Sequence, residues 1–310
     1  MHPDRLPRLI LTALVLACAW PPVTAPMALG VGLLFGLMVR HPDPGGAARL
    51  SKTLLQMSVV GLGFGLNISQ VWEAGRTGVI YTLVGIGFTL LLGRYLGRWL
   101  RVPSRTAALI SVGTAICGGS AIAALAPVVE ADDDEISVSL AAVFTLNAVA
   151  LFVFPLIGHW VGLDQRQFGL WAALAIHDTS SVVGAGAVYG ATALAVATTV
   201  KLARAAWIAP VTLFAAWRRG SRTRPQMPWF ILGFLAAAVL RSVVPQGDPA
   251  WDVLSQASKR ILVATLLLIG SGMTRQVLRR VGLRPMVQAV TLWIIVGTLT
   301  LGAILGGWVS

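Results

Sequence analysis

The chain has 310 residues, of which 56% are hydrophobic and 12% are charged, and its formal net charge is +12. Average soluble domains carry about 25% charged residues, so this composition excludes an ordinary soluble globular protein. A basic chain can bind nucleic acid, but here the arginines stand in short loops between apolar segments, where they act as topology signals.

The apolar segments, taken in chain order, predict a membrane protein made only of helices. Four uninterrupted helices are predicted first, over residues 9–24, 26–40, 50–67 and 77–97. An element interrupted by polar residues and glycine follows over 104–129, then a full helix over 135–157, a second interrupted element over 166–189 and a full helix over 191–217. Three more helices are predicted over 228–244, 258–274 and 285–308. The fold class is therefore an all-α polytopic membrane protein with about nine to eleven membrane segments, two of them interrupted or re-entrant.

The basic residues between these segments predict the orientation. Cytoplasmic loops carry an excess of lysine and arginine. Placing all four basic clusters in the cytoplasm gives a multi-pass protein of the bacterial inner membrane, with a cytoplasmic N-terminus and a periplasmic C-terminus. The first helix is followed at once by another apolar run, so we expect a membrane helix there rather than a cleaved signal peptide. The four clusters are Arg40, Arg49 and Lys52; Arg94, Arg98, Arg101 and Arg105; Arg218, Arg219, Arg222 and Arg224; and Arg275, Arg279, Arg280 and Arg284.

A weak internal repeat relates the two halves of the chain. Residues 50–65 resemble residues 257–272, and the two interrupted elements form a second matched pair, each followed by a helix that contains a proline. We therefore predict one transporter domain over 1–310, with repeat one at about 26–157 and repeat two, in rotated order, at about 166–308. Inverted repeats are the usual plan of secondary transporters. Chance similarity between apolar runs is the alternative.

The path of the two interrupted elements has two interpretations. Both could cross the membrane as broken helices, which suits their lengths of roughly 24–26 residues. Both could instead enter and return as hairpins. Only hairpins make the two elements point in opposite directions, as the other repeat pair does, so the sequence favours hairpins slightly.

The interruptions themselves are the candidate site. The first is GTAICGGS at 113–120, and the second is HDTSS at 177–181. A helix that restarts at membrane depth directs its N-terminal N–H groups towards a cavity, where they bind oxyanions, and neighbouring hydroxyls add donors. Close packing of helices through small residues is the alternative for the first stretch. The candidate substrate-binding residues in these stretches are Thr114, Cys117, Gly118, Gly119, Ser120, His177, Asp178, Thr179, Ser180 and Ser181.

Two cations occur in the apolar helix that follows. Lys201 and Arg204 are three residues apart and share a helix face. With Asp178 they leave one net positive charge at membrane depth, which suits an anion; the alternative is a structural ion pair between Asp178 and one of the cations. His177 could couple transport to protons or could be a neutral histidine bonded to backbone, and Asn147 could be a ligand or a bridge between backbone groups. We expect residues 112–121 and 176–182 to converge at one cavity near the bilayer midplane, facing Lys201.

Three motifs carry a resemblance to a known family. The stretch GTAICGGSAIAALAP at 113–127 resembles the signature of the YeiH-like sulfate exporter family of bacterial inner-membrane proteins, as do AIHDT at 175–179 and VKLAR at 200–204 with Ala209 and Pro210. The resemblance covers about residues 26–310 and implies a transporter related to the cation/proton antiporter and anion transporter group. Members often carry Ala where Gly119 stands and an amide or Ala where Ser180 and Ser181 stand, so the finer substrate selectivity stays open.

Residues and resemblance together predict a secondary transporter of a small oxyanion, of the sulfate or sulfite class, which works as an exporter by alternating access. An ion-coupled carrier of an organic acid or sulfonate would use the same architecture. We expect no enzyme, because a serine hydrolase needs a positioned nucleophile with an oxyanion hole and an aspartyl site needs two acids. The expected partners are a small inorganic or organic anion and the lipid bilayer, without nucleic acid; a homodimer is left open. No metal or cofactor is expected, and H⁺ or Na⁺ are the candidate coupling ions.

Overall fold

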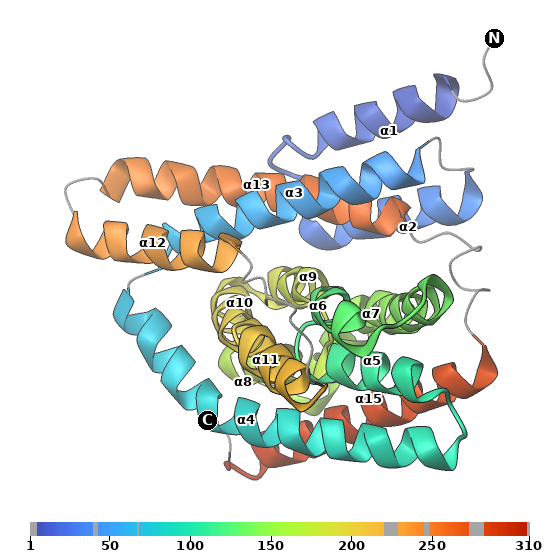
Figure 1. Cartoon of the computed structure of the whole chain (residues 1–310). Coiled ribbons are helices and arrows are strands. Elements are labelled where there is room, and N and C mark those ends of the chain that lie inside the picture. Colours follow the sequence, from blue (N-terminus) through green and yellow to red (C-terminus); the bar gives the residue numbers. More distant parts are fainter. Residues whose placement is uncertain are drawn as a thin grey trace. The chain divides into compact units, whose positions relative to one another are not determined.

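A computed structural model describes residues 5–39, 43–66, 68–219, 229–244, 248–272 and 282–308. In these residues every regular element is an α-helix (Figure 1), which confirms the predicted all-α class. Helices within 134–161, 191–218, 249–271 and 283–305 are long and apolar enough to cross a membrane by length and composition, as a polytopic membrane protein requires. Several residues of the predicted basic clusters lie outside the described residues: Arg40, Arg222, Arg224, Arg275, Arg279 and Arg280.

The helices form two compact units, and each is built from two separate parts of the chain. Unit one takes residues 1–71 and 229–278, and unit two takes residues 72–228 and 279–310. Unit one contains α1 (Arg5–Ala17), α2 (Ala25–Met38), α3 (Pro44–Gly63), α12 (Trp229–Val243) and α13 (Asp248–Ser271). Unit two contains most of α4 (Ile68–Trp99) together with α5 (Ser104–Ala115), α6 (Gly119–Val129), α7 (Asp133–Val161), α8 (Gln165–Ala175), α9 (Thr179–Tyr189), α10 (Ala191–Ala205), α11 (Ile208–Arg219) and α15 (Leu283–Leu305).

Both halves of the predicted repeat contribute to both units. The matched stretches at 50–65 and 257–272 lie in α3 and α13 of unit one, where Gly61 of α3 packs directly on Ser258 of α13. Arg241 of α12 forms an ion pair with Asp252 of α13 at 2.7 Å. The two interrupted elements both lie in unit two. This distribution is compatible with the repeat, which stays a prediction.

The first interrupted element, α5 and α6, folds back on itself. Arg105 at the start of α5 lies 3.9 Å from the carboxylate of Glu135 at the start of α7, and the Ser139 hydroxyl of α7 donates to the Thr106 carbonyl at 3.5 Å. The contacts of α7 therefore bring it beside the start of α5. Because α6 ends only four residues before α7 begins, the end of α6 lies at the same end of unit two as the start of α5. The acidic loop is the start of α7, where Asp132 and Glu135 form a capping box.

The second interrupted element, α8 and α9, folds back in the same way. The side-chain oxygen of Gln165, at the start of α8, accepts from the Thr192 N–H at 2.9 Å, just beyond the end of α9. The Tyr189 hydroxyl at the end of α9 donates to the Leu163 carbonyl at 2.6 Å. Both elements are therefore hairpins in this structure, the interpretation that the sequence favoured slightly. Since α7 is about 43 Å long and joins the end of the first hairpin to the start of the second, the two hairpins enter unit two from opposite ends.

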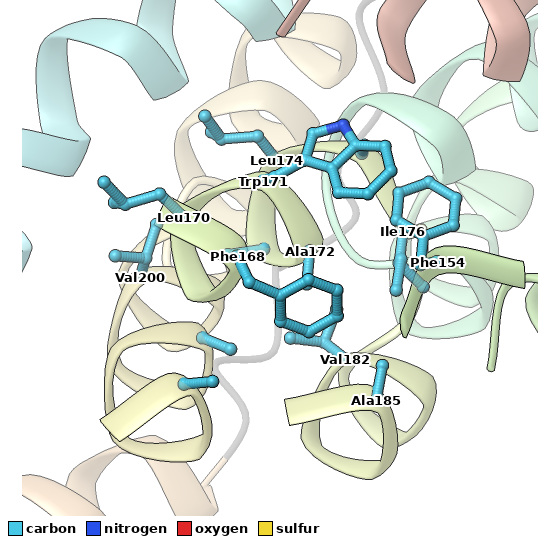
Figure 2. Close-up of a cluster of buried hydrophobic side chains, with 14 of the residues drawn as sticks. Phe154, Phe168, Leu170, Trp171, Ala172, Leu174, Ile176, Val182, Ala185 and Val200 are labelled. Carbon is cyan, nitrogen blue, oxygen red and sulfur yellow. The ribbon is translucent and has the colours of Figure 1, made fainter. Parts of the chain in front are cut away.

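An apolar cluster holds the second hairpin between α7 and α10. Figure 2 shows the side chains of α7, α8, α9 and α10 gathered together, with Phe154 beside Trp171. These two rings stack with centroids 4.3 Å apart, and the indole N–H of Trp171 donates to the Gly297 carbonyl of α15 at 2.9 Å. Val182 and Val200 are fully buried in the same cluster. The hairpin is thus fixed on three sides, which positions its tip.

Hairpins and crossing helices differ in where single cysteines can be labelled. The two native cysteines, Cys18 and Cys117, are free and buried, so they give little background. With hairpins, Asp134→Cys should react with a membrane-impermeant maleimide from the same side as Trp99→Cys, which lies at the end of α4, and Trp160→Cys should react from the other side. Labelling of intact cells and of inverted vesicles measures this. Reaction of Asp134→Cys and Trp99→Cys from opposite sides would contradict the hairpin fold.

Candidate functional site

The tips of the two hairpins meet inside unit two. The first tip is residues 116–118 and the second is residues 176–178. Gly118 has a φ of +65°, and a Cβ built on it would lie 2.9 Å from the Cβ of Asp178. The stretches 112–121 and 176–182 therefore converge, although they are far apart in the sequence.

Arg204 of α10 joins the C-terminal ends of the two half-helices. Its Nε donates to the carbonyl of Ala115, the last residue of α5, at 2.7 Å. Its Nη1 donates to the carbonyls of Leu174 and, at 3.5 Å, Ala173 in the last turn of α8. One fully buried guanidinium thus bridges both hairpins.

Lys201 lies one turn earlier on α10 and serves the second hairpin alone. Its Nζ donates to the carbonyl of Ile176 at 2.6 Å and to that of Ala173 at 3.4 Å. The last carbonyls of a helix have no partner within the helix, and each helix C-terminus carries about half a negative charge. The two buried cations satisfy these carbonyls and balance the negative ends of α5 and α8. No acidic side chain is needed for this.

The ion pair that the sequence suggested between Asp178 and one of these cations is not found in the described structure. Asp178 is instead the N-cap of α9, where its carboxylate accepts from the Ser181 N–H at 3.1 Å and from the Ser180 hydroxyl. The expectation that both restarting helices present open N-terminal ends is therefore wrong for α9. An aspartate directly before a helix is a strong N-cap and occupies the end of the helix itself.

The N-terminus of α6, in contrast, has no side-chain cap. Its N-cap is Gly118, which has no side chain to offer. Gly119 is half-buried and Ser120 is exposed, so the first turn of α6 is accessible. Gly119 also packs against α7, since a Cβ on it would lie 2.9 Å from Cζ of Phe144. At the junction of the two tips, this helix end can receive an anion.

Three buried polar side chains lie near the junction without a hydrogen-bond partner among the described residues. These are Thr114 on α5, Asn147 on α7 and His177 in the second tip, each at most 2% exposed. Asn147 lies three residues, about 4.5 Å, beyond the Phe144 that packs on Gly119. The backbone bonds considered for Asn147 and His177 are not found. A buried polar group without a partner costs about 1–3 kcal/mol, so these are the groups that a polar ligand would engage.

The other predicted residues lie in the first tip or in the first turn of α9, and they are less accessible than Ser120. Ser180 is half-buried and is bonded to Asp178. Cys117, Thr179 and Ser181 are buried. The described cavity of unit two lies between α4, α5, α6 and α11 and includes no residue of either tip, so the structure brings the predicted residues together without enclosing them in that cavity.

Sequence reasoning missed the backbone carbonyls that hold the cations, and it missed Gln288. The amide of this fully buried side chain on α15 donates to the Gly93 carbonyl at 3.1 Å and the Ala107 carbonyl at 3.2 Å, which ties α15 to α4 and α5. A lone glutamine within the apolar run 285–308 was the available signal, because polar residues in such segments usually face protein.

The comparisons with known proteins identify the family. Residues 13–289 match a family described as conserved hypothetical protein 698. The chain belongs to this family. It is 52% identical to the UPF0324 membrane protein GSU2818 of Geobacter sulfurreducens over 99% of both chains. It is 47% identical to the UPF0324 membrane protein Bd1437 of Bdellovibrio bacteriovorus, over 100% of this chain and 97% of the relative. A UPF0324 membrane protein of Porphyromonas gingivalis is also 47% identical, over 92% of this chain and 87% of the relative.

The family is thus one of membrane proteins, in agreement with the apolar helices. The names of these relatives give no substrate. No solved structure matches the chain.

Proposed function

We propose that this family member is a secondary transporter that exports a small oxyanion, of the sulfate or sulfite class, across the bacterial inner membrane by alternating access. The observation that carries the proposal is the meeting of two hairpin tips, which enter from opposite ends, at the open N-terminus of α6. Hairpins with this arrangement place one junction between the two sides of the membrane. Substrates of secondary transporters bind at such repeat interfaces, near the bilayer midplane.

The charges at the junction favour an anion. Lys201 and Arg204 are buried beside the junction, where they offset the negative ends of α5 and α8, and Asp178 is the acidic side chain of the two tips. The Asp178 carboxylate is already engaged by Ser180 and Ser181, which leaves it a poor ligand for a metal cation. Donors therefore outnumber free acceptors at the accessible end of α6, and a helix N-terminus binds oxyanions through its N–H groups.

The membrane potential favours export as the direction of transport. Moving one charge against it costs about 2.3 kcal/mol per 100 mV. Export of an anion from a cell that is negative inside is electrically downhill, so it can run without a coupling ion, whereas uptake is electrically uphill, which favours coupling to H⁺ or Na⁺. The proposal includes the orientation expected from the arginine clusters, with the N-terminus in the cytoplasm and the C-terminus in the periplasm.

A carrier suits the junction better than an enzyme does. Ser180 donates to Asp178, and the ring nitrogens of His177 have no partner among the described residues, so no Ser–His pair is formed. A second acid that could act with Asp178 is not found in either tip. A carrier of an organic acid or sulfonate is the alternative with the same architecture, and a substrate screen separates the two.

Flux measurements with the purified protein in liposomes test the proposal. We expect uptake of radiolabelled sulfate or sulfite that follows a clamped potential, positive on the receiving side, both with and without a pH gradient. Flux that depends strictly on a pH or Na⁺ gradient would remove the uncoupled export mechanism but keep the oxyanion. Transport of organic sulfonates alone would favour the alternative substrate, and transport of a cation without any oxyanion flux would overturn the proposal.

Ser120 gives a test that depends on the sign of the substrate charge. Ser120→Asp places a carboxylate in the first turn of α6, which helps the helix by about 0.3–1 kcal/mol and should leave the protein folded. It should repel an anion and reduce oxyanion flux by about tenfold or more, since 1.4 kcal/mol already gives a factor of ten. The uncharged Ser120→Asn is the matched control and should retain most of the flux. Equal flux in both variants would show that α6 does not receive the anion.

A further inference from the structure

A second feature of unit two lies apart from the hairpin tips. A cavity of about 710 Å³ lies between α4, α5, α6 and α11, at the end of the unit where α5 begins and α6 ends. Its walls are mainly apolar and include Leu91, Leu125 and Phe214. This volume is within the range of about 300–1,000 Å³ that small-molecule sites have.

Three arginines stand at one end of this cavity. Arg94 and Arg98 are one turn apart on α4, and Arg218 is near the end of α11. All three are exposed, and none forms an ion pair within the described parts of the chain. Arg218 lies with its Cζ 6.0 Å from the centre of the Phe214 ring, so the charged end and the apolar wall adjoin. Three positive charges without an acidic partner among the described residues can bind an anionic group.

The lining of the cavity, with its charged end included, has about the length of one membrane leaflet. Along α4, the lining runs from Arg98 to Gly87, eleven residues or about 16 Å. Half of the hydrocarbon core of a bilayer is about 15 Å. Leu91 and Phe214 are 73% and 57% exposed, so the cavity opens sideways. A free oxyanion would gain contacts only at the arginines, whereas a lipid would use the charged end and the apolar wall together.

We propose that this cavity is a binding site for an anionic phospholipid, with the headgroup phosphate on Arg94, Arg98 and Arg218 and an acyl chain along α4 towards Gly87. Basic pockets between membrane helices bind anionic headgroups on the cytoplasmic side. Arg94 and Arg98 belong to one of the four basic clusters and Arg218 to another, and the positive-inside rule assigns both clusters to the cytoplasmic side. The site does not depend on the transported substrate, because no tip residue lines it.

The test is native mass spectrometry of the full chain in detergent, with phosphatidylglycerol or phosphatidylcholine added. We expect phosphatidylglycerol to bind more tightly than phosphatidylcholine. The double variant Arg94→Gln, Arg98→Gln should bind it on the order of twentyfold more weakly, since each arginine near a headgroup contributes about a fivefold factor. The double variant with lysine at both positions keeps the charges and should retain most of the affinity.

Two glycines on α4 give a matched test of the apolar part. A Cβ built on either Gly85 or Gly87 would meet no atom within 4 Å, but of the two only Gly87 lines the cavity. Gly87→Trp should displace part of the acyl chain from the cavity. It should weaken phosphatidylglycerol binding by more than about tenfold, because each acyl methylene that is no longer buried raises the dissociation constant about fourfold. Gly85→Trp should bind like the wild type. Equal binding by the two tryptophan variants, equal binding of the two lipids, or displacement of phosphatidylglycerol by millimolar inorganic sulfate would each overturn the proposal.

Discussion

Replacement of Arg204 by methionine is expected to destabilise the pair of hairpins by about 2–6 kcal/mol, because the buried carbonyls of Ala115 and Leu174 lose their donor at about 1–3 kcal/mol each. The guanidinium donates to carbonyls of Ala115, Leu174 and Ala173 and is 1% exposed. Without it, the negative C-terminal end of α5 has no cation beside it, and that of α8 keeps only Lys201. The midpoint of thermal aggregation in detergent should fall on the order of 10 °C, and anion flux should be lost.

Two variants control this experiment. Arg204→Lys keeps the charge but has no planar fork to reach two helix ends at once, so it should lie between the wild type and Arg204→Met. Arg94→Met removes an exposed arginine of the same unit and should leave the midpoint unchanged. If Arg204→Met were as stable as Arg94→Met, the guanidinium would not hold the hairpins together. If Arg204→Met were stable but had no flux, Arg204 would instead be a substrate ligand, as the sequence predicted.

The second large effect is expected for Gly118→Ala. The backbone there has φ +65° and ψ −126°, a conformation that residues with a side chain rarely adopt, at a cost of about 1–3 kcal/mol. The added methyl would also press on the Cβ of Asp178, the N-cap of α9, at 2.9 Å. The two tips would have to separate, so both the thermal midpoint and the flux should fall.

Gly162→Ala separates the two causes of this effect. Gly162 ends α7 with φ +76°, but a Cβ on it would meet no atom within 4 Å. This variant carries backbone strain without a collision, so its thermal midpoint should fall by less and its flux should be retained. Identical behaviour of the two variants would mean that contact between the tips does not matter.

The sequence predicted where the helices break, but only part of how the breaks are stabilised. Clusters of adjacent glycine and polar residues within apolar runs located both tips, because an interrupted helix at membrane depth must be buried in protein or line a cavity. The HDTSS stretch also contained the N-cap of α9, since an aspartate followed by hydroxyl residues and an apolar run is a helix-start signal. The sequence left open whether Asp178 forms an ion pair with Lys201 or Arg204, because two cations at membrane depth need negative charge nearby.

The negative charge came from the backbone, which the sequence cannot reveal. Every residue has a carbonyl, so nothing marks Ala115, Leu174 or Ile176 as partners of Arg204 and Lys201. Those contacts exist only because the hairpins bring two helix C-termini to one face of α10. Likewise, nothing in the sequence of α4 indicates that Arg94 and Arg98 adjoin a cavity, since its other wall comes from α11.

The order of these partners along the chain has a consequence for synthesis. The carbonyl of Ala115 precedes its donor Arg204 by 89 residues. At about 5–20 residues per second, the first hairpin leaves the ribosome roughly 4–18 s before the guanidinium that completes it. During that interval the end of α5 needs another donor, such as water in the insertion channel. Arg204, in contrast, emerges after both Ala115 and Leu174, whose carbonyls accept from it. Its charge, which is costly in lipid, therefore has its partners already synthesised when it enters the membrane.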